Sequence, residues 1–316
     1  MTILSPTKRN INKASTVLKE GGLVAFATET VYGLGCDTFN IDAIKLVYKT
    51  KGRPINNPMI AHILEPEWST QLTDEWDERC KNLAATFWPG SLTIVLPKKE
   101  TVPSAACGGR ETIAIRCPQH PVARNLLSVF NQPISAPSAN KSGYISPTTA
   151  QHVEDEYGGL LLVIDGGPCK EGIESTVLSL VETPSILRRG TIPVCELESV
   201  VGTVLQPKHL GQNDSPGTAK QHYSPHTTTS LISTQEINTL DDRAATALVL
   251  SGRPEQIKTC IQMPQNQKEY GAKLYDALRA ADNQNPSHIF IEHPPTTQEW
   301  LTIQDRLVRC TAKRIN

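Results

Sequence analysis

Cations and small polar residues recur in short segments that follow or open expected strands. The densest segment, Lys49 to Pro58, joins three cations to two asparagines. Arginine can donate two parallel hydrogen bonds to phosphate oxygens, and lysine adds a point charge. Asn57 could orient an oxygen, so this segment could bind a polyphosphate. The alternative is a solvated basic turn, because cations also suit the carboxyl end of a helix.

Two further cationic points end expected strands. Arg116 closes the apolar run 112–115 and can pair a small-molecule carboxylate, while Arg188 and Arg189 precede a turn at Gly190. For both points an ordinary surface ion pair is the alternative, since such pairs are common and weak.

Hydroxyl and amide side chains gather in the segments 135–143 and 174–176. They suit hydrogen bonding to a ligand hydroxyl or phosphate. Serine and asparagine are equally favoured in plain turns, so each segment is a weak signal by itself.

Composition and missing motifs exclude several classes of function. The 31 basic and 32 acidic residues leave a formal net charge of 31 − 32 = −1, which argues against broad electrostatic adhesion to nucleic acid or membrane. The sequence has no phosphate loop, dinucleotide fingerprint or nucleophile elbow. No apolar run nears the roughly 20 residues of a membrane span and no signal peptide opens the chain, so a cytosolic location is expected.

Short apolar runs that alternate with helical patterns predict an α/β domain. The expected helices cover 8–20, 42–48, 74–87, 121–130 and 148–156. The expected strands cover 23–27, 59–64, 92–96, 112–115, 160–164 and 176–180. Two glycines make a loop the expectation for 28–35.

The pattern predicts a domain over 1–201, a linker over 202–228 and a second domain over 229–316. The linker is rich in Pro, Gly, Asn and Ser, yet contains His222 and Tyr223, which a linker without function would not need. Strands over 247–250 and 289–292 and a helix over 268–281 predict a small Rossmann-like α/β domain. A closing helix would place Trp300, Ile303, Leu307 and Val308 on one face.

Seven segments, in family order, resemble the YrdC-type threonylcarbamoyl-AMP synthases in their long form with a C-terminal extension. They are 28–35, 51–54, 87–90, 114–116, 136–140, 172–177 and 186–190, and the linker segment 215–225 extends the resemblance. Two positions depart from the family pattern: Thr218 replaces a usual methionine, and Arg189 stands where proline is common. The resemblance implies that the first domain is a twisted mixed sheet with helices.

The resemblance implies the conversion of L-threonine, bicarbonate and ATP to threonylcarbamoyl-AMP, pyrophosphate and water, for modification of a tRNA adenosine beside the anticodon. Lys51 and Arg53 would be catalytic. The implied ATP-binding residues are Lys51, Arg53, Asn57, Thr112, Ser138, Ser146, Arg189 and Tyr223. The implied L-threonine-binding residues are Thr30, His62, Arg116, Ala136 and Ser175.

The same resemblance sets expectations for cofactors and partners. Mg²⁺ would accompany ATP without a protein-made cage, since no cluster of acidic residues announces one. The product would pass to a downstream tRNA threonylcarbamoyl-transfer complex, while direct binding of tRNA stays open. Because the intermediates are labile in water, residues 214–226 are expected to close over the nucleotide as a lid.

Two other functions compete with the synthase. One is a related carbamoyl-transfer enzyme with another acceptor, and the other is a non-catalytic RNA-binding module of the same fold. An amino-acid acceptor is favoured by Thr30, Arg116 and Ser175, whereas an RNA-binding module would need a basic face.

Overall fold

The computed structural model of the chain describes residues 2–206, 223–251 and 254–311. The described residues form two compact units. The first unit holds 2–142, 147–170 and 174–206, and the second holds 143–146, 171–173, 223–251 and 254–311. Two short segments from the first part of the sequence therefore belong to the second unit.

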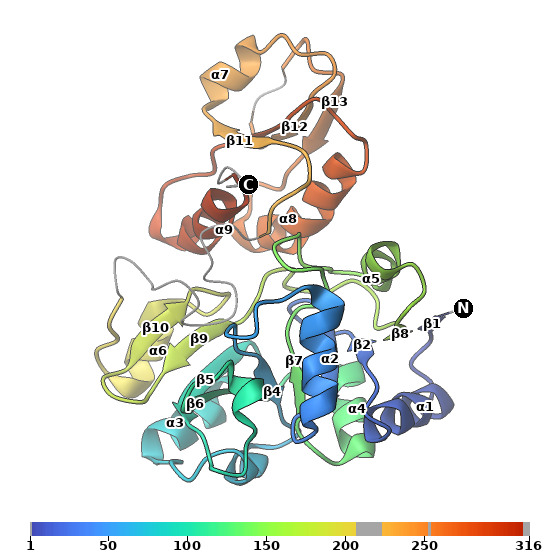
Figure 1. Cartoon of the computed structure of the whole chain (residues 1–316). Coiled ribbons are helices and arrows are strands. Elements are labelled where there is room, and N and C mark those ends of the chain that lie inside the picture. The colour runs from blue at the N-terminus through green and yellow to red at the C-terminus, as the bar shows by residue number, and fades with distance from the viewer. Residues whose placement is uncertain (1, 207–222, 252–253, 312–316) are drawn as a thin grey trace. The chain divides into compact units, whose positions relative to one another are not determined.

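A mixed ten-stranded sheet runs through residues 2–206 in the order β1-β8-β2-β3-β7-β4-β6-β5-β9-β10 (Figure 1). Its strands are β1 (Ile3–Leu4), β2 (Val24–Phe26), β3 (Gly33–Asp37), β4 (Ile60–His62), β5 (Leu92–Pro97), β6 (Thr112–Arg116), β7 (Ile134–Ala136), β8 (Leu162–Ile164), β9 (Thr176–Ser179) and β10 (Ser185–Arg188). Parallel and antiparallel pairs both occur, so the predicted mixed α/β fold is confirmed.

Helices cover this sheet and end close to the expected residues. They are α1 (Lys8–Lys19), α2 (Ile41–Lys51), α3 (Glu78–Phe87), α4 (Pro121–Phe130), α5 (Ala150–Tyr157) and α6 (Val194–Val201), with short 3₁₀ turns at Pro66–Gln71 and Ser104–Cys107. The expected start of α3 at Asp74 is wrong. The helix begins at Glu78 because the Asp77 carboxylate accepts a hydrogen bond from the Cys80 backbone N–H, at 3.1 Å, and so caps it.

The expected loop over 28–35 is partly wrong, since Gly33–Asp37 forms strand β3. Gly35 is required there by close packing rather than by a turn. A Cβ atom on Gly35 would lie 2.7 Å from the Phe26 ring and 2.8 Å from the Ile134 side chain. The glycines that suggested a loop instead let β3 lie flat between β2 and β7.

The two faces of the central strands differ in chemistry, because side chains alternate along a strand. Ile94 and Ile115 on one face join the main hydrophobic core. On the opposite face Ile60, Val95 and Ala114 form a separate small cluster with Val177 and Leu187. We call this opposite face the polar face, because polar side chains lie at both ends of its apolar cluster. It belongs to β7, β4, β6, β5, β9 and β10.

The second unit contains a four-stranded parallel sheet in the order β11-β14-β12-β13. Its elements are β11 (Thr229–Ile232), α7 (Thr234–Thr239), β12 (Thr246–Val249), β13 (Thr259–Gln262), α8 (Gln267–Asp282), β14 (Ile289–Glu292), a 3₁₀ turn at Gln298–Trp300 and α9 (Leu301–Thr311). The predicted small C-terminal α/β domain is confirmed, and its sheet is parallel. Val308, however, is 62% exposed and does not lie on the buried face of α9, which carries Arg306 instead.

Part of the linker falls outside the described residues. Residues 214–222 of the expected lid are among those not described, so the lid stays a prediction. The domain boundaries after residues 201 and 228 also stay predictions. None of the described helices combines the length and apolar character that a membrane span requires.

Candidate active site

The register of the strands brings several residues that were predicted to bind L-threonine onto the polar face. His62 on β4 pairs with Arg116 on β6. Strands β6 and β5 are antiparallel, and Ile115 pairs with Ile94. One step further along this register, Arg116 lies opposite Thr93. Residues opposite each other on neighbouring strands point to the same side of a sheet, so these three side chains form a row. Ser175 lies next to this row, where its hydroxyl oxygen is 2.7 Å from that of Thr93.

Arg116 is the buried cation at the centre of this row. Its side chain is 3% exposed and donates three hydrogen bonds, from Nη2 to Glu29 Oε1 at 2.7 Å, from Nη1 to Thr30 Oγ1 at 2.9 Å and from Nε to the Gly90 carbonyl at 3.1 Å. A guanidinium group carries five N–H donors. Among the described residues, two donors therefore remain on its terminal nitrogens, as many as a carboxylate accepts from an arginine fork.

Glu29 supplies the charge that allows Arg116 to be buried. Its second carboxylate oxygen accepts hydrogen bonds from the backbone N–H groups of Gln119, at 3.1 Å, and His120, at 3.3 Å. Burial by itself would raise the pKa of Glu29, but attraction to Arg116 and the hydrogen bonds outweigh burial, and the pKa lies below its usual value. Glu29 is therefore ionised, and the surface ion pair considered for Arg116 is in fact a buried one.

His62 is a neutral imidazole with a defined tautomer. Its Nδ1 lies 3.3 Å from the Ile134 carbonyl oxygen, which can only accept, so the Nδ1 atom carries the proton and Nε2 is an acceptor. Burial, together with the nearby positive charge of Arg116, lowers the pKa of His62 to about 3. His62 can accept a hydrogen bond from a substrate but does not add a charge to the site.

The predicted nucleotide-binding cations lie at the other end of the same strands. The Asn40 side chain caps α2, and the left-handed Gly52 ends it, with φ of 60°. These ends place Lys51 on the last turn and Arg53 just beyond it. Both side chains are buried, so a solvated basic turn is excluded for them.

Lys51 is held by backbone oxygens. Its Nζ donates to the Ser138 carbonyl at 2.5 Å and to the Asn140 carbonyl. Burial first, and then the nearby charge of Arg53, lower the pKa of Lys51 well below its usual value. A carbonyl does not cancel a positive charge, so an anion such as a phosphate would favour the protonated form of Lys51.

Arg53 and Asn57 form one rigid pair. The Arg53 guanidinium donates to the Asn57 side-chain oxygen at 2.6 Å, to the Asn57 carbonyl at 3.1 Å and to the Pro58 carbonyl at 2.8 Å. Pro58 leads directly into β4, so this pair is fixed to the amino end of that strand.

Strand direction separates the two sets of residues. Arg53 and Asn57 precede β4, Thr112 begins β6, which is parallel to β4, and Ser138 follows β7, which is antiparallel to both. All four therefore share one edge of the sheet. His62 and Arg116 end β4 and β6, so they lie toward the opposite edge. Ala136 pairs with Ile60 and lies between the two sets.

The remaining predicted residues are placed as follows. Arg189 is half-buried at the end of β10, and Ser146 is fully buried in the second unit. Tyr223, also in the second unit, stacks on Tyr275 with ring centroids 5.3 Å apart, and the Arg306 guanidinium lies 5.2 Å from its ring centroid. The contacts expected between these residues and ATP stay predictions.

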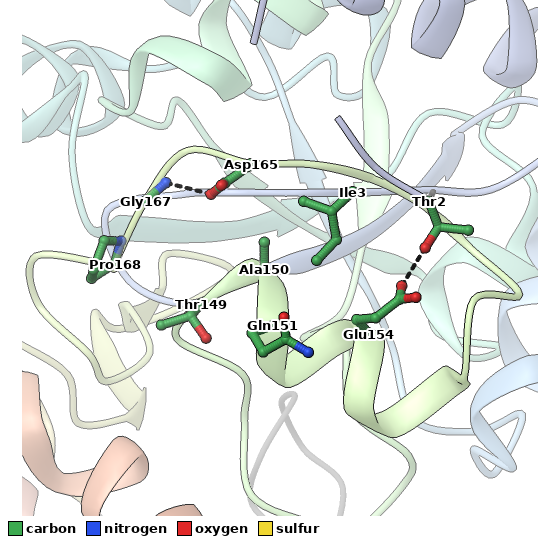
Figure 2. Close-up of a pocket in the computed structure, with 9 residues that line it drawn as sticks. All are labelled: Thr2, Ile3, Thr149, Ala150, Gln151, Glu154, Asp165, Gly167 and Pro168. Carbon is green, nitrogen blue, oxygen red and sulfur yellow. Dashed lines mark hydrogen bonds between the residues drawn. The ribbon is translucent and has the colours of Figure 1, made fainter. Parts of the chain in front are cut away.

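A separate pocket of about 630 Å³ lies in the first unit and contains none of the predicted site residues (Figure 2). It is lined by residues of β1, of the start of α5 and of the loop after β8. Two pairs of its polar groups bond each other: the Gly167 N–H donates to Asp165 at 2.8 Å, and the Thr2 hydroxyl bonds Glu154. We assign no chemistry to this pocket.

Two residues of the site, Glu29 and Thr93, had no role in the sequence interpretation, and Asn140 and Arg188 were considered there only as members of a polar and a cationic segment. Glu29, Asn140 and Arg188 lie inside recognised segments, and the signal for Glu29 was a lone acid directly after a buried strand. A buried carboxylate is stabilised by a buried cation, so Glu29 could have been paired with Arg116 from the sequence. Thr93 gave no signal, because a threonine inside an apolar strand is ordinary.

Comparisons with known proteins identify the family of the chain. A model of the family described as "Telomere recombination" matches residues 16–190, more than half of the chain, and a model described as "Threonylcarbamoyl-AMP synthase, C-terminal domain" matches residues 192–312. The chain belongs to the threonylcarbamoyl-AMP synthase family. It carries both parts of the long form.

Individual members of the threonylcarbamoyl-AMP synthase family align over much or all of the chain. The synthase of Bacillus subtilis is 38% identical over 332 residues, covering 99% of this chain and 96% of the relative. That of Pyrococcus abyssi is 44% identical over 237 residues, covering 71% and 70%. The solved structure of P. abyssi Sua5 complexed with L-threonine superposes with a TM-score of 0.93 at 34% identity and covers 98% of both chains.

The neutral state of His62 predicts how stability depends on pH. The unfolded chain takes up a proton at this residue near pH 6.5, but the folded chain does so only near pH 3. Between these values the unfolded state binds more protons, so stability falls as pH falls, by about 1.4 kcal/mol per pH unit for one such group. His62→Gln is expected to make the slope of unfolding free energy between pH 4.5 and 6 shallower by about that amount.

Urea unfolding followed by tryptophan fluorescence at several pH values measures this slope for both proteins. Other titrating groups are common to the wild type and the variant, so their effects cancel in the difference. Equal slopes would mean that His62 is charged in the folded protein.

Proposed function

We propose that this chain is an L-threonylcarbamoyladenylate synthase, a nucleotidyltransferase that converts L-threonine, bicarbonate and ATP to threonylcarbamoyl-AMP, pyrophosphate and water. The observation that carries the proposal is the buried Arg116, with two N–H donors left for a carboxylate on a sheet face whose other end holds Lys51 and Arg53. The near full-length match to the B. subtilis synthase and the likeness to a threonine-bound structure support it.

The reaction needs position and charge more than a covalent nucleophile. The threonine amine would capture bicarbonate as a carbamate with loss of water, and a carbamate oxygen would attack the α-phosphorus of ATP while pyrophosphate leaves. Lys51 and Arg53 would stabilise the negative charge on the phosphates from a buried position, where cations act more strongly than in water. Arg116 would fix the substrate carboxylate and thereby orient the amine.

Each predicted ligand has a proposed part of the site. The ATP-binding role of Lys51, Arg53, Asn57, Thr112 and Ser138 is supported by their shared edge of the sheet. The threonine-binding role of His62, Arg116 and Ser175 is supported by the row on the polar face, and that of Thr30 by its hydrogen bond with Arg116. The role of Ala136, which packs in the main hydrophobic core, rests on the resemblance alone. Ser146, Arg189 and Tyr223 are proposed as further ATP ligands on the resemblance alone.

A magnesium ion would come with the nucleotide. Within the residues that the structure describes, no group of three or more His, Cys, Asp or Glu side chains could hold a metal ion. Lys51 itself contacts the backbone carbonyls of Ser138 and Asn140 and lies near the Arg53 cation, an arrangement that suits an anion and not a metal ion. Delivery of the product to a tRNA threonylcarbamoyl-transfer complex and the cytosolic location stay predictions.

Pyrophosphate release from ATP tests the activity. The purified chain is expected to release pyrophosphate when L-threonine, bicarbonate and Mg-ATP are all present, and to release almost none when any one of them is omitted. Release that does not depend on L-threonine would overturn the proposal, and release with an acceptor other than an amino acid would favour the related carbamoyl-transfer enzyme.

Two single substitutions test the division of the site. Arg53→Ala is expected to raise the KM for ATP at least tenfold and leave the KM for threonine nearly unchanged, because a lost charge-assisted hydrogen bond costs about 1.5–3 kcal/mol. Arg116→Ala is expected to do the reverse. Steady-state kinetics with each substrate varied in turn measure both constants, and identical profiles for the two variants would contradict the division.

A further inference from the structure

Helix α8 of the second unit presents three buried side chains in a row. Tyr275, Arg279 and Asp282 are spaced four and three residues apart, so they lie along one side of the helix. Their side chains are buried. Each of them contacts one of two segments that join the second unit from elsewhere in the sequence, 143–146 and 223–227.

Asp282 ties these two segments to each other. Its Oδ2 atom accepts hydrogen bonds from the Tyr144 hydroxyl and the His226 backbone N–H, both at 2.9 Å, and its Oδ1 atom accepts from the Thr227 backbone N–H at 2.8 Å. Burial by itself would raise the pKa of Asp282, but the hydrogen bonds, those from the backbone first, outweigh burial, and the pKa lies below its usual value. One ionised carboxylate therefore holds Tyr144 and residues 226–227 together.

The helix itself does not favour an acid at this position. Asp282 is the last residue of α8, where the helix dipole favours a cation and disfavours a carboxylate. A buried carboxylate placed against this preference is stable only because its partners compensate it. Residues that break a local rule in this way are expected at functional sites.

Arg279 holds segment 143–146 one turn earlier on α8. Its Nη2 atom donates to the Ile145 carbonyl, and its guanidinium group lies 4.7 Å from the centroid of the Tyr144 ring. The same ring stacks on His226, with ring centroids 4.4 Å apart. Because the Ile145 carbonyl belongs to the peptide bond with Ser146, Arg279 also fixes the backbone of Ser146.

The end of the linker is fixed on the same helix. The Tyr223 ring stacks on Tyr275, and the Ser224 backbone N–H donates to the Gly143 carbonyl at 3.0 Å. Tyr223 has a left-handed backbone, with φ of 63°, which a bulky residue seldom adopts. Such a conformation persists only where the surroundings fix it. The contacts with Tyr275 and Gly143 supply that restraint.

Segment 143–146 continues directly from residues that surround Lys51. The Lys51 ammonium donates to the carbonyls of Ser138 and Asn140, and the Lys51 carbonyl accepts from the Ser142 backbone N–H at 2.8 Å. Gly143 is the next residue in the chain. A change in the backbone of segment 143–146 would therefore be passed along the chain to the carbonyl groups that hold Lys51.

We propose that α8 is a positioning element for ATP and that Asp282 is its central positioning residue. The inference rests on the proposed function, in which Lys51, Ser146 and Tyr223 contact ATP. It assigns a task to the second unit, which is to hold the segments that carry Ser146 and Tyr223 in the arrangement that binds the nucleotide. Asp282 acts through these segments.

Asp282→Asn tests the proposal through the affinity for ATP. The amide keeps the shape of the side chain but turns one of its two acceptor atoms into a donor, so at least one of the three hydrogen bonds is lost. The Kd for Mg-ATP, from calorimetric titration of the intact chain, is expected to rise about five- to tenfold, the effect of one hydrogen bond. The KM for L-threonine at saturating ATP is expected to stay unchanged, because Arg116 and Glu29 belong to the first unit.

Glu292→Gln is the matched control. Glu292 is a second buried carboxylate of the same unit, and it accepts hydrogen bonds from the hydroxyls of Thr234 and Ser251 and from the Leu250 backbone N–H. The substitution removes the same charge and the same kind of hydrogen bond, but these partners lie outside the two segments. It is expected to lower the free energy of unfolding and to leave the Kd for Mg-ATP unchanged.

Tyr144→Phe serves if Asp282→Asn does not fold. It removes only the hydroxyl that donates to Asp282 and keeps the ring that packs on Arg279 and His226. The Kd for Mg-ATP is expected to rise about two- to fivefold, in the same direction as for Asp282→Asn.

The outcomes separate this inference from the proposed function. If Glu292→Gln weakens ATP binding as much as Asp282→Asn, Asp282 has a merely structural role and the inference fails. It also fails if neither Asp282→Asn nor Tyr144→Phe changes the Kd. If the wild type binds ATP but releases no pyrophosphate with L-threonine, the proposed function fails, while the comparison of Kd values still decides the inference. A wild type that does not bind ATP would overturn both.

Discussion

The site depends on a single buried charge pair, Arg116 with Glu29. A buried guanidinium without a partner would be very unfavourable, and removal of one partner from a buried ion pair typically costs about 3–5 kcal/mol. One carboxylate oxygen of Glu29 accepts a hydrogen bond from Arg116, and the other accepts from the backbone N–H groups just before α4. Burial first, and then the positive charge of Arg116, oppose protonation of the His62 imidazole and outweigh the opposite effect of Glu29. A fixed cation and a neutral acceptor thus arise from one arrangement.

The sheet orders the rest of the chemistry. One face of the central strands packs into the main core, and the other carries a small apolar cluster with polar groups at both ends. Antiparallel and parallel neighbours alternate so that the ends of β4 and β6 and the starts of β5 and β9 meet at one edge. Lys51 and Arg53 meet the other edge because α2 ends at Gly52 and the chain then turns into β4. A carboxylate subsite and a phosphate subsite can therefore lie at opposite edges of one sheet in the first unit.

The sequence predicted the elements with strong periodicity and the residues that lie in dense polar segments. Helix α4 was predicted with both ends, since Pro121 starts it and its apolar face is regular. Strand β3 was missed because its glycines usually signal a turn, whereas Gly35 is needed because the Phe26 and Ile134 side chains approach it closely. Long-range partners were beyond the sequence: Thr93 and Arg188 are 95 positions apart (188 − 93), and a strand register, not a local pattern, brings them together. Val308 was wrongly predicted to lie on the buried face of α9, because helical spacing alone does not say which side of the helix is buried. In the structure Arg306 is buried and Val308 is exposed.

The central claim is that Arg116, held by Glu29 and Thr30, recognises the substrate carboxylate. Calorimetric titration of the intact chain with L-threonine and with L-threoninol, in which an alcohol replaces the carboxylate, tests it directly without ATP or catalysis. Loss of two charge-assisted hydrogen bonds should weaken binding of L-threoninol by about a hundredfold or more. Equal affinity for the two compounds would contradict the account.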